Sequence, residues 1–598
     1  MLDSSAKSNP GALSRGIINT GKEDECLQVN HAGVKGSFSF LKIPTPEGVL
    51  VSEDVALEGA IVSHWYEEIN DLKSLTPYFE GIYSFCHPHA CSGVDLKILI
   101  DTYFNHKIDY KIVNVNRSLT PNPSLIQKLS IFAIISLICY TIISTIQFNV
   151  STNTIKYIRN IGSRNFDVVS NIKLFVRKYE IEDKNIRSTD FINGWKTFYL
   201  VSALIIHMLS HIEVSVYNLN INTSKYLSYF ENFKLLFSRL SIETMVINIC
   251  SSAIVTCVTV VPFIESMKLK KRSLLLVTLL RYLRLLPVLS FSIMIILISP
   301  LIPFHSSGIF HSQVTSNMAK KCSNYAWAEF LLINNFVAID KVCLGVSWFL
   351  SADVQLSIIT FPLLIALIKN LKKGIKLSFL YIILGIISEY IVIYIHYDAH
   401  NMVHMKFEKE NSYENMFPYH AWSMNYISSY SIGLVFGILI QKGIKIPEKY
   451  SNIPTGTLAL VVELIFLIYT IDINYWDESS KLITIGVASV LRTIAAIGMC
   501  TTMYSLWMEK DNWMKKILTS TYLFNTCSRI MLPSFLSHAL ALIWISSYAY
   551  SSVPEITLFQ LISRWCIMLP LTILCGLILH ILVEVPFMKV LKSFVGKK

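Results

Sequence analysis

Long apolar runs recur along this chain, and their length limits what it can fold into. A helix needs about 20 consecutive apolar residues to cross the hydrocarbon core of a bilayer. About eleven runs approach or exceed that length, at residues 128–148, 198–215, 240–264, 278–302, 345–368, 376–396, 424–441, 456–474, 482–507, 529–548 and 558–585. The pattern predicts an all-α polytopic membrane protein with about eleven transmembrane helices.

The composition and the placement of charge support this prediction. Of the 598 residues, 53% are hydrophobic and 16% are charged, which is far from the composition of a soluble domain. The net charge of +11 would suit a nucleic-acid partner, but the basic residues fall in short loops between the runs. These loops lie at residues 268–272, 369–376, 442–449, 510–516 and 589–598. With eleven spans all five lie on one side, so the positive-inside rule predicts a cytoplasmic C-terminus, an extracytoplasmic N-terminus and no role for nucleic acid.

Cysteines and glycosylation motifs follow the same predicted topology. Five cysteines fall in or beside segments assigned to the exterior, where disulfides persist: Cys26, Cys86, Cys91, Cys322 and Cys343. Cys322 and Cys343 bracket 20 residues and are predicted to form a disulfide, the alternative being two free thiols near the membrane. The sequons at Asn116 and Asn222 are also exterior, which makes the protein a candidate glycoprotein.

Residues 1–125 alternate polar and apolar stretches without a long helical pattern, which predicts an N-terminal extracytoplasmic, cysteine-bearing domain. Cys86 and Cys91, with two histidines between them, have the composition of a metal site. Zinc sites usually show tighter cysteine pairs with a second pair nearby, so a disulfide is favoured and no metal is expected. The opening string Met1–Arg15 lacks the apolar core of a signal peptide. Either the N-terminus is truncated, or the first span inserts unaided with its N-terminus outside.

Residues 126–190 are predicted to hold the first transmembrane helix and a polar, basic cytoplasmic loop. The string GWKTFYLVSALIIHMLSH then places two histidines in an apolar run. Lys196 stands at the polar entry, His207 lies about three helical turns deeper, and His211 follows one turn later. A histidine held in a cavity can take a proton from a hydroxyl. The alternative is that both histidines only hydrogen-bond between helices.

Further polar residues enter the later runs. Arg281 and Arg284 share one helical face, either as positive-inside anchors or as clamps for the phosphates of a nucleotide-like donor. Trp348, Asp353 and Gln355 enter an otherwise apolar helix, and a carboxylate at membrane depth requires a partner.

Several strings of the chain form an ordered set of motifs: FCHPHACSGVDLKILID, Gly194-x-Lys196-x10-His207, RYLRLLP, C-x4-W-x2-FLLINNF, C-x4-WFLSADVQ, Trp422 with Tyr430, Gly433 and Gly437, CSRIMLPSFLSH ending at His538, and VEVP with Glu584 and Pro586. In this order, the motifs resemble the nose-resistant-to-fluoxetine type of membrane protein, whose main domain belongs to the acyltransferase 3 family. The resemblance covers roughly residues 80–595 and implies that 191–595 form the acyltransferase 3 transmembrane domain. The chain departs from the family pattern in three places: Lys196 replaces the usual arginine, Ile249 and Cys250 replace a small polar pair, and Met424 stands near a common arginine position.

The resemblance implies transfer of an acyl group, other than an amino-acyl group, from acyl-coenzyme A to a hydroxyl of a lipid or small-molecule acceptor. His207 is then the expected base, with Lys196 as its catalytic companion, and Arg281 and Arg284 would bind the donor phosphates. Further candidate polar site residues are Trp348, Asp353, Gln355, His538 and Glu584.

Acyl-coenzyme A would be a co-substrate, and no bound cofactor is expected. Expected partners also include membrane lipids, and the expected location is the plasma membrane or the endoplasmic reticulum. Two alternatives stay open: a carrier of lipids or lipophilic compounds across epithelial membranes, and a catalytically silent descendant.

Overall fold

The computed structural model describes residues 18–19, 30–31, 34–43, 81–88, 90–91, 94–98, 111–114, 123–149, 164–176, 191–219, 245–246, 248–265, 272–302, 309–338, 341–395, 421–445, 481–508, 513–520, 522–549 and 558–595. Cys26, the sequons at Asn116 and Asn222, and the predicted span 456–474 lie outside these residues.

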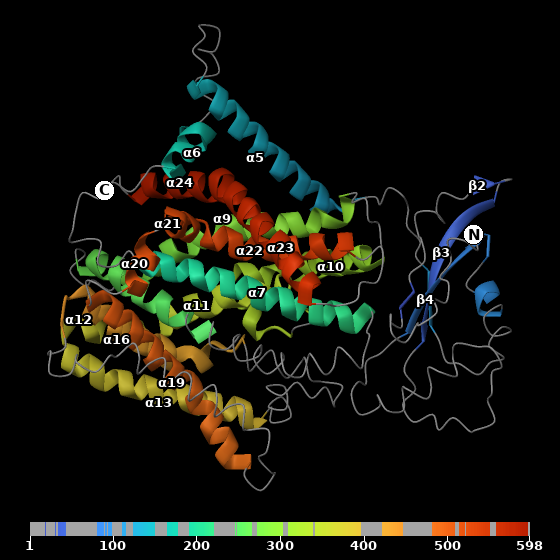
Figure 1. Ribbon diagram of the computed structural model, residues 1–598. Coiled ribbons are helices and arrows are strands. Elements are labelled where there is room, and N and C mark those ends of the chain that lie inside the picture. Colours follow the sequence, from blue (N-terminus) through green and yellow to red (C-terminus); the bar gives the residue numbers. More distant parts are fainter. Residues whose placement is uncertain are drawn as a thin grey trace.

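A small sheet precedes the helices (Figure 1). Its described strands are β1 (Ile18–Asn19), β2 (Asn30–His31), β3 (Val34–Ile43), β4 (Gly81–Pro88) and β5 (Lys111–Asn114). The order is β1-β4-β3-β2, with β5 also paired to β3, and β3 and β4 form the long antiparallel ladder. The description all-α therefore holds for the helical part of the protein and not for the region before residue 125. Cys86 is disulfide-bonded, whereas Cys91 carries a free thiol.

The remainder of the described chain is almost entirely helical. Its elements are α5 (Leu125–Asn149), α6 (Val168–Val176), α7 (Phe191–Leu219), a helix over Asn248–Glu265, α9 (Arg272–Ile298), α10 (Ile309–Phe330), α11 (Trp348–Ile359), α12 (Phe361–Lys369), α13 (Leu371–Ile395), α16 (Ile427–Gln441), α19 (Lys481–Met508), α20 (Trp513–Ser520), α21 (Tyr522–Arg529), α22 (Met531–Ala549), α23 (Leu558–Leu579), a π-helical segment (His580–Glu584) and α24 (Val585–Val595).

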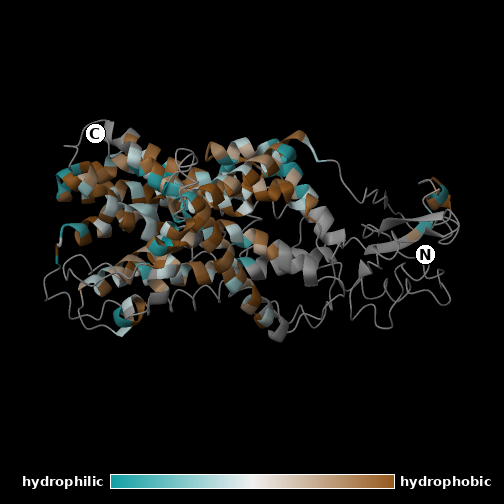
Figure 2. Cartoon of the chain, turned by 90° about the horizontal axis from the view of Figure 1, so that it is seen from above, coloured by the Kyte–Doolittle hydropathy of each residue, from teal (hydrophilic) through white to brown (hydrophobic). Residues whose placement is uncertain are grey.

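Six of the described helices are long and apolar enough to cross a membrane, and hydrophobic residues dominate the helical part (Figure 2). They are Leu125–Asn149, Asn248–Glu265, Leu276–Leu301, Leu371–Ile395, Ser423–Gln441 and Trp565–Ser593. Helices α11 and α12 form a seventh candidate that bends by 47°. This bent pair corresponds to the span predicted at 345–368, and the helix is interrupted because Pro362 at the start of α12 has no N–H to continue it. The total of eleven spans stays a prediction.

The centre of the bundle is the contact between α16 and the helix Asn248–Glu265. In the span that contains α16, 78% of the apolar stretch is buried, whereas in α5 only 17% of it is buried. Helix α16 is therefore central and α5 is peripheral. A Cβ on Gly433 would lie 2.7 Å from the Cβ of Ala253, and one on Gly437 would lie 2.8 Å from that of Cys257. The two glycines, four residues apart, let the backbones approach closely.

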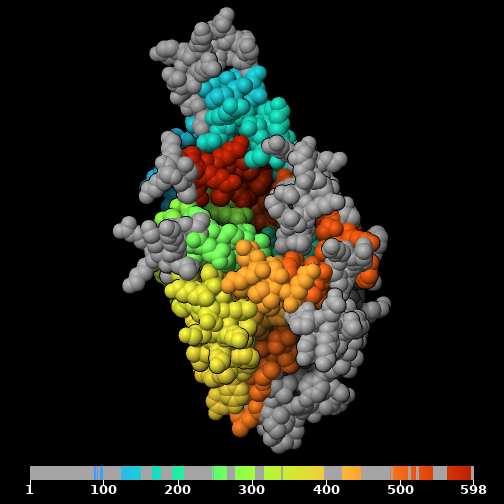
Figure 3. All heavy atoms as spheres, turned by 90° about the vertical axis from the view of Figure 1, so that its left-hand side faces the viewer, coloured from blue at the N-terminus to red at the C-terminus, as the bar shows by residue number. Residues whose placement is uncertain are grey.

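Several helix ends meet at one end of the bundle. The Lys442 ammonium donates to the carbonyl of Ile368 at 2.9 Å, and the Tyr504 hydroxyl donates to the carbonyl of Ile444 at 2.7 Å. Gly194, at the start of α7, lies against Leu518 of α20. Three of the basic loops of the sequence adjoin these contacts. Seen from that end, the surface is hollowed between the red C-terminal segments and the green helices (Figure 3).

The predicted disulfide between Cys322 and Cys343 is confirmed. It joins α10 to the segment before α11, where the Glu329 carboxylate accepts hydrogen bonds from the Leu344 N–H at 3.0 Å and from Asn334 Nδ2 at 2.7 Å. Burial raises the pKa of Glu329, and these hydrogen bonds act against that rise. The disulfide and the carboxylate together fix the turn that leads into α11.

Candidate functional site

Two histidines from distant parts of the sequence meet between α7 and α22. His207 Nδ1 lies 2.7 Å from His538 Nε2, and the two ring planes are within 7° of each other. His538 is fully buried, and the ring of Phe535 lies 5.3 Å from it, centroid to centroid. The side chain of His211 lies outside the described ones. The sequence singled out both His207 and His538, and the structure brings them together.

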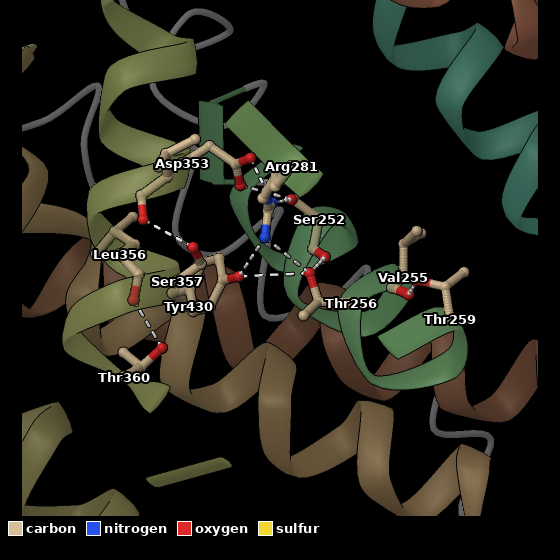
Figure 4. A network of polar contacts seen from close by, with 11 residues as sticks. Ser252, Val255, Thr256, Thr259, Arg281, Asp353, Leu356, Ser357, Thr360 and Tyr430 are labelled. Atoms are coloured by element: carbon tan, nitrogen blue, oxygen red, sulfur yellow. Dashed lines mark hydrogen bonds and ion pairs between the residues drawn. The ribbon is translucent and has the colours of Figure 1, made fainter. Parts of the chain in front are cut away.

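The first arginine of the R-x2-R motif is enclosed by polar side chains (Figure 4). Arg281 on α9 forms an ion pair with Asp353 of α11. Its guanidinium also donates to the Ser252 hydroxyl at 2.9 Å, to Thr256 Oγ1 at 3.2 Å and to the Tyr430 hydroxyl at 3.4 Å. The Ser252 hydroxyl in turn donates to Asp353 at 2.6 Å. These contacts tie α9, α11, α16 and the helix Asn248–Glu265 to one cation.

The second arginine is far more accessible. The side chain of Arg284 is 59% exposed, and its Nη2 lies 3.9 Å from Glu584 Oε1. The other oxygen of Glu584 accepts a hydrogen bond from His580 Nδ1 at 2.7 Å. Glu584 and His580 are the last and first residues of the π-helical segment, a type of distortion that is frequent at functional sites.

The positive charge of Lys196 interacts with that of Arg284, and these two residues are called the cationic cluster below. Lys196 stands before the apolar run that begins at residue 198, and it is half-buried. Burial, and to a smaller extent the positive charge of Arg284, lower the pKa of Lys196 to about 8. Two cations held together, one of them with a depressed pKa, form a site suited to an anionic ligand.

Helix α6 packs against the π-helical segment that carries Glu584. The buried Asn171 donates from Nδ2 to the carbonyl of Ile581 at 3.2 Å and accepts from Lys589 Nζ at 2.6 Å. The ring of Phe175 meets that of His580 edge-on at 5.6 Å between centroids. The neighbourhood of Glu584 is therefore held by residues from both ends of the helical part.

The other two predicted polar residues have packing partners. Trp348 stacks on Tyr426 with ring centroids 6.1 Å apart. Gln355 exchanges amide hydrogen bonds of 2.9 Å with Asn335 and donates to the carbonyl of Leu332 at 2.7 Å. The Gln355 contacts brace the segment between α10 and α11, and the Trp348 ring joins α11 to the turn before α16. None of these contacts brings either residue to the histidine pair.

Sequence reasoning missed one charged pair at membrane depth. Arg492 of α19 lies 3.2 Å from Glu389 of α13, both side chains are 1% exposed, and the guanidinium stands over the ring of Tyr426. Both residues interrupt apolar runs, which is the signal that identifies intramembrane functional or paired charges. Within the described part of the chain, no three His, Cys, Asp or Glu side chains are grouped to hold a metal ion.

Apolar helices that enclose a histidine pair, with a more open cationic cluster near the start of α7, define a membrane protein with polar chemistry between its helices. A family model described as an acyltransferase domain matches residues 189–581, which is more than half of the chain. The chain belongs to the acyltransferase 3 family, as the sequence motifs predict. No curated protein and no solved structure matches it. Lys196, His207, both arginines, Asp353 and His538 lie inside the matched region, and Glu584 lies just beyond it.

Proposed function

We propose that this protein is a membrane-bound O-acyltransferase that moves an acyl group from acyl-coenzyme A to a hydroxyl of a lipid or small-molecule acceptor. The observation that carries the proposal is the imidazole pair of His207 and His538, 2.7 Å apart within the matched acyltransferase domain. An imidazole whose orientation is fixed by a partner is a suitable general base for a hydroxyl.

The donor phosphates are assigned to Lys196 and Arg284. Both belong to the cationic cluster, and Arg284 is exposed enough to meet a ligand. Arg281 is assigned to a different role, because Asp353, Ser252, Thr256 and Tyr430 already surround its guanidinium. On this assignment Arg281 orders the helix on which Arg284 stands, one turn away.

Lys196 and His207 are separated by about 16 Å along α7, at about 1.5 Å per residue. An elongated donor can therefore place its phosphates at the cationic end and its thioester near the base. His207 takes the proton of the acceptor hydroxyl while the oxygen attacks the thioester carbonyl carbon. The resulting tetrahedral intermediate collapses as the carbon–sulfur bond breaks. The products are the acyl ester and the thiolate of coenzyme A, which takes the proton from His207 and so restores the neutral base.

The proposal includes a topology. The cationic end of α7 faces the cytoplasm, together with the C-terminal tail, and the Cys322–Cys343 disulfide and the N-terminal region face the opposite side. Eleven spans satisfy this arrangement. The bent pair of α11 and α12 supports it, because the disulfide precedes the pair and a basic loop follows it. The plasma membrane and the endoplasmic reticulum are both compatible compartments, and membrane lipids are the immediate surroundings.

The test uses the purified full-length protein with acetyl-coenzyme A and palmitoyl-coenzyme A, and it measures thiol release with and without membrane lipid as acceptor. His207→Ala is expected to lower transfer by about 10²–10⁴-fold, as loss of a general base does. His211→Ala is expected to cost much less. Equal transfer by His207→Ala and the wild type would show that His207 is not the base.

A carrier of lipids or lipophilic compounds is the second candidate function. The observation that favours it is the fully buried pair of Glu389 and Arg492, since charges at membrane depth commonly mark a translocation path. A carrier would move a fluorescent lipid across proteoliposomes without any acyl donor. Glu389→Gln would then reduce this movement, while His207→Ala would leave it unchanged.

A further inference from the structure

The contact between His207 and His538 requires a proton on one of its two nitrogens. Two ring nitrogens at 2.7 Å are within hydrogen-bond distance, and in such a bond one is the donor and the other the acceptor. A neutral imidazole carries a single N–H. In each ring, the partner of the nitrogen outside this contact therefore decides whether the nitrogen inside it donates or accepts.

The second nitrogen of His538 settles its own tautomer. His538 Nδ1 is hydrogen-bonded to the carbonyl oxygen of Phe535, one turn earlier on α22. A carbonyl oxygen only accepts, so Nδ1 of His538 carries the hydrogen. In the neutral ring, Nε2 of His538 is then an acceptor. It follows that His207 donates from Nδ1, and that the basic nitrogen of neutral His207 is Nε2.

We propose that His538 is a positioning residue that fixes the tautomer and the ring orientation of His207, so that His207 Nε2 takes the proton of the acceptor hydroxyl. This inference rests on the proposed function, in which His207 is the base. Two hydrogen bonds connect the three residues. One lies within α22, from His538 to the Phe535 carbonyl, and the other joins α7 to α22, from His207 to His538.

The surroundings of the pair suit this role. His538 is fully buried, and the Phe535 ring packs against both imidazoles, with centroids 6.0 Å from that of His207 and 5.3 Å from that of His538. A ring confined in this way keeps one orientation. When His207 is protonated its Nδ1–H stays bonded to His538, and the dipole of the Phe535 carbonyl at the far end of the two hydrogen bonds favours the positive charge. The same arrangement serves the base before and after proton transfer.

The experiment compares His538→Gln with His538→Leu in the purified full-length protein. Glutamine keeps an acceptor oxygen for the Nδ1–H of His207, whereas leucine fills a similar volume without one. His538→Leu should lower kcat for thiol release from palmitoyl-coenzyme A by about 10–100-fold, by analogy with the partners that orient metal-bound imidazoles. His538→Gln should recover much of this loss. KM for the donor should be the same in both, because His538 is not assigned to the donor.

Two outcomes overturn the positioning role. The first is an equal kcat in the His538→Gln and His538→Leu variants. The second is a His538→Leu variant in which only KM changes. If His538→Leu does not fold, His538→Ala takes its place in the comparison with Gln. Failure of the proposed function gives a different result. A wild-type protein that transfers no acyl group contradicts that function and the positioning role together. If His207→Ala loses transfer while His538→Leu keeps the wild-type kcat, only the positioning role is contradicted.

Discussion

The two arginines of the R-x2-R motif have opposite environments, and this difference predicts opposite effects of mutation. Arg281→Gln leaves the buried Asp353 carboxylate without its counter-charge, so it should destabilise the fold by about 3–5 kcal/mol. Arg284→Gln removes a largely exposed group, and its effect on stability should stay below about 1 kcal/mol. Thermal unfolding in detergent measures both. Equal losses in the two variants would contradict the separate roles.

The depressed pKa of Lys196 predicts pH-dependent binding of the donor. Burial, and then the charge of Arg284, lower this pKa to about 8, so the ammonium loses its proton as the pH rises through that value. The affinity for acetyl-coenzyme A should fall by about tenfold between pH 7 and pH 9, the scale of one lost charged hydrogen bond.

Lys196→Arg is the matched control for this pH dependence. A guanidinium stays charged over the whole range, so the affinity of the variant should vary much less with pH. Titration calorimetry at several pH values follows both proteins. A wild-type affinity that does not change from pH 7 to pH 9 would remove Lys196 from the donor site.

The sequence identified many of these residues but few of their partners. Asp353 was expected to need a partner at membrane depth, yet nothing in the sequence pointed to Arg281, 72 residues away. His207 and His538 are 331 residues apart, and the spacing along a chain does not say which helices pack together. Glu389 and Arg492 interrupt apolar runs, so the sequence marks both as charges that need a partner, but it does not show that they pair with each other.

At the scale of elements, the approach of α16 to the helix Asn248–Glu265 depends on two glycines. Gly433→Ala would place a Cβ 2.8 Å from the carbonyl oxygen of Cys250 and 2.7 Å from the Ala253 side chain, so the helices must separate. The expected loss of stability is about 1–3 kcal/mol. Gly486→Ala on α19 is the control, because nothing lies within 4 Å of its added Cβ. Similar melting temperatures for the two variants would contradict the close contact.

The helices themselves were largely predictable, because a bilayer-length apolar run has few alternatives to a helix. The run 376–396 became α13 (Leu371–Ile395), and the run 424–441 lies within the span Ser423–Gln441. The π-helical segment was not predictable, since the same apolar sequence suits a continuous α-helix. Its register depends on tertiary contacts, such as the bond from Asn171 to the carbonyl of Ile581. The sheet was missed because its two long strands, β3 and β4, are separated by residues 44–80, and spacing along the chain does not show that they pair.

At the scale of the whole molecule, charge and covalent structure divide the protein into two ends. The contacts of Lys442 with Ile368 and of Tyr504 with Ile444 gather helix ends beside three basic loops. The disulfide between Cys322 and Cys343 lies before α11, and the basic loop at 369–376 follows α12. If the α11–α12 pair spans the membrane, the cystine and the basic loop lie on opposite sides, as the positive-inside rule and the redox difference across a membrane require.

This arrangement predicts that the C-terminal tail is cytoplasmic and that residues 303–342, which include α10, are exterior. An epitope tag after Lys598 should bind antibody only after the cells are permeabilised, whereas a tag inserted between residues 304 and 308 should bind it in intact cells or in intact inverted microsomes. The disulfide gives an independent readout in the untagged protein, because Cys322 and Cys343 should resist alkylation until a reductant is added. A tail that is labelled in intact cells would invert the proposed topology. The cationic cluster of Lys196 and Arg284 would then face away from the cytoplasmic pool of acyl-coenzyme A, and the acyltransferase proposal would require a different donor.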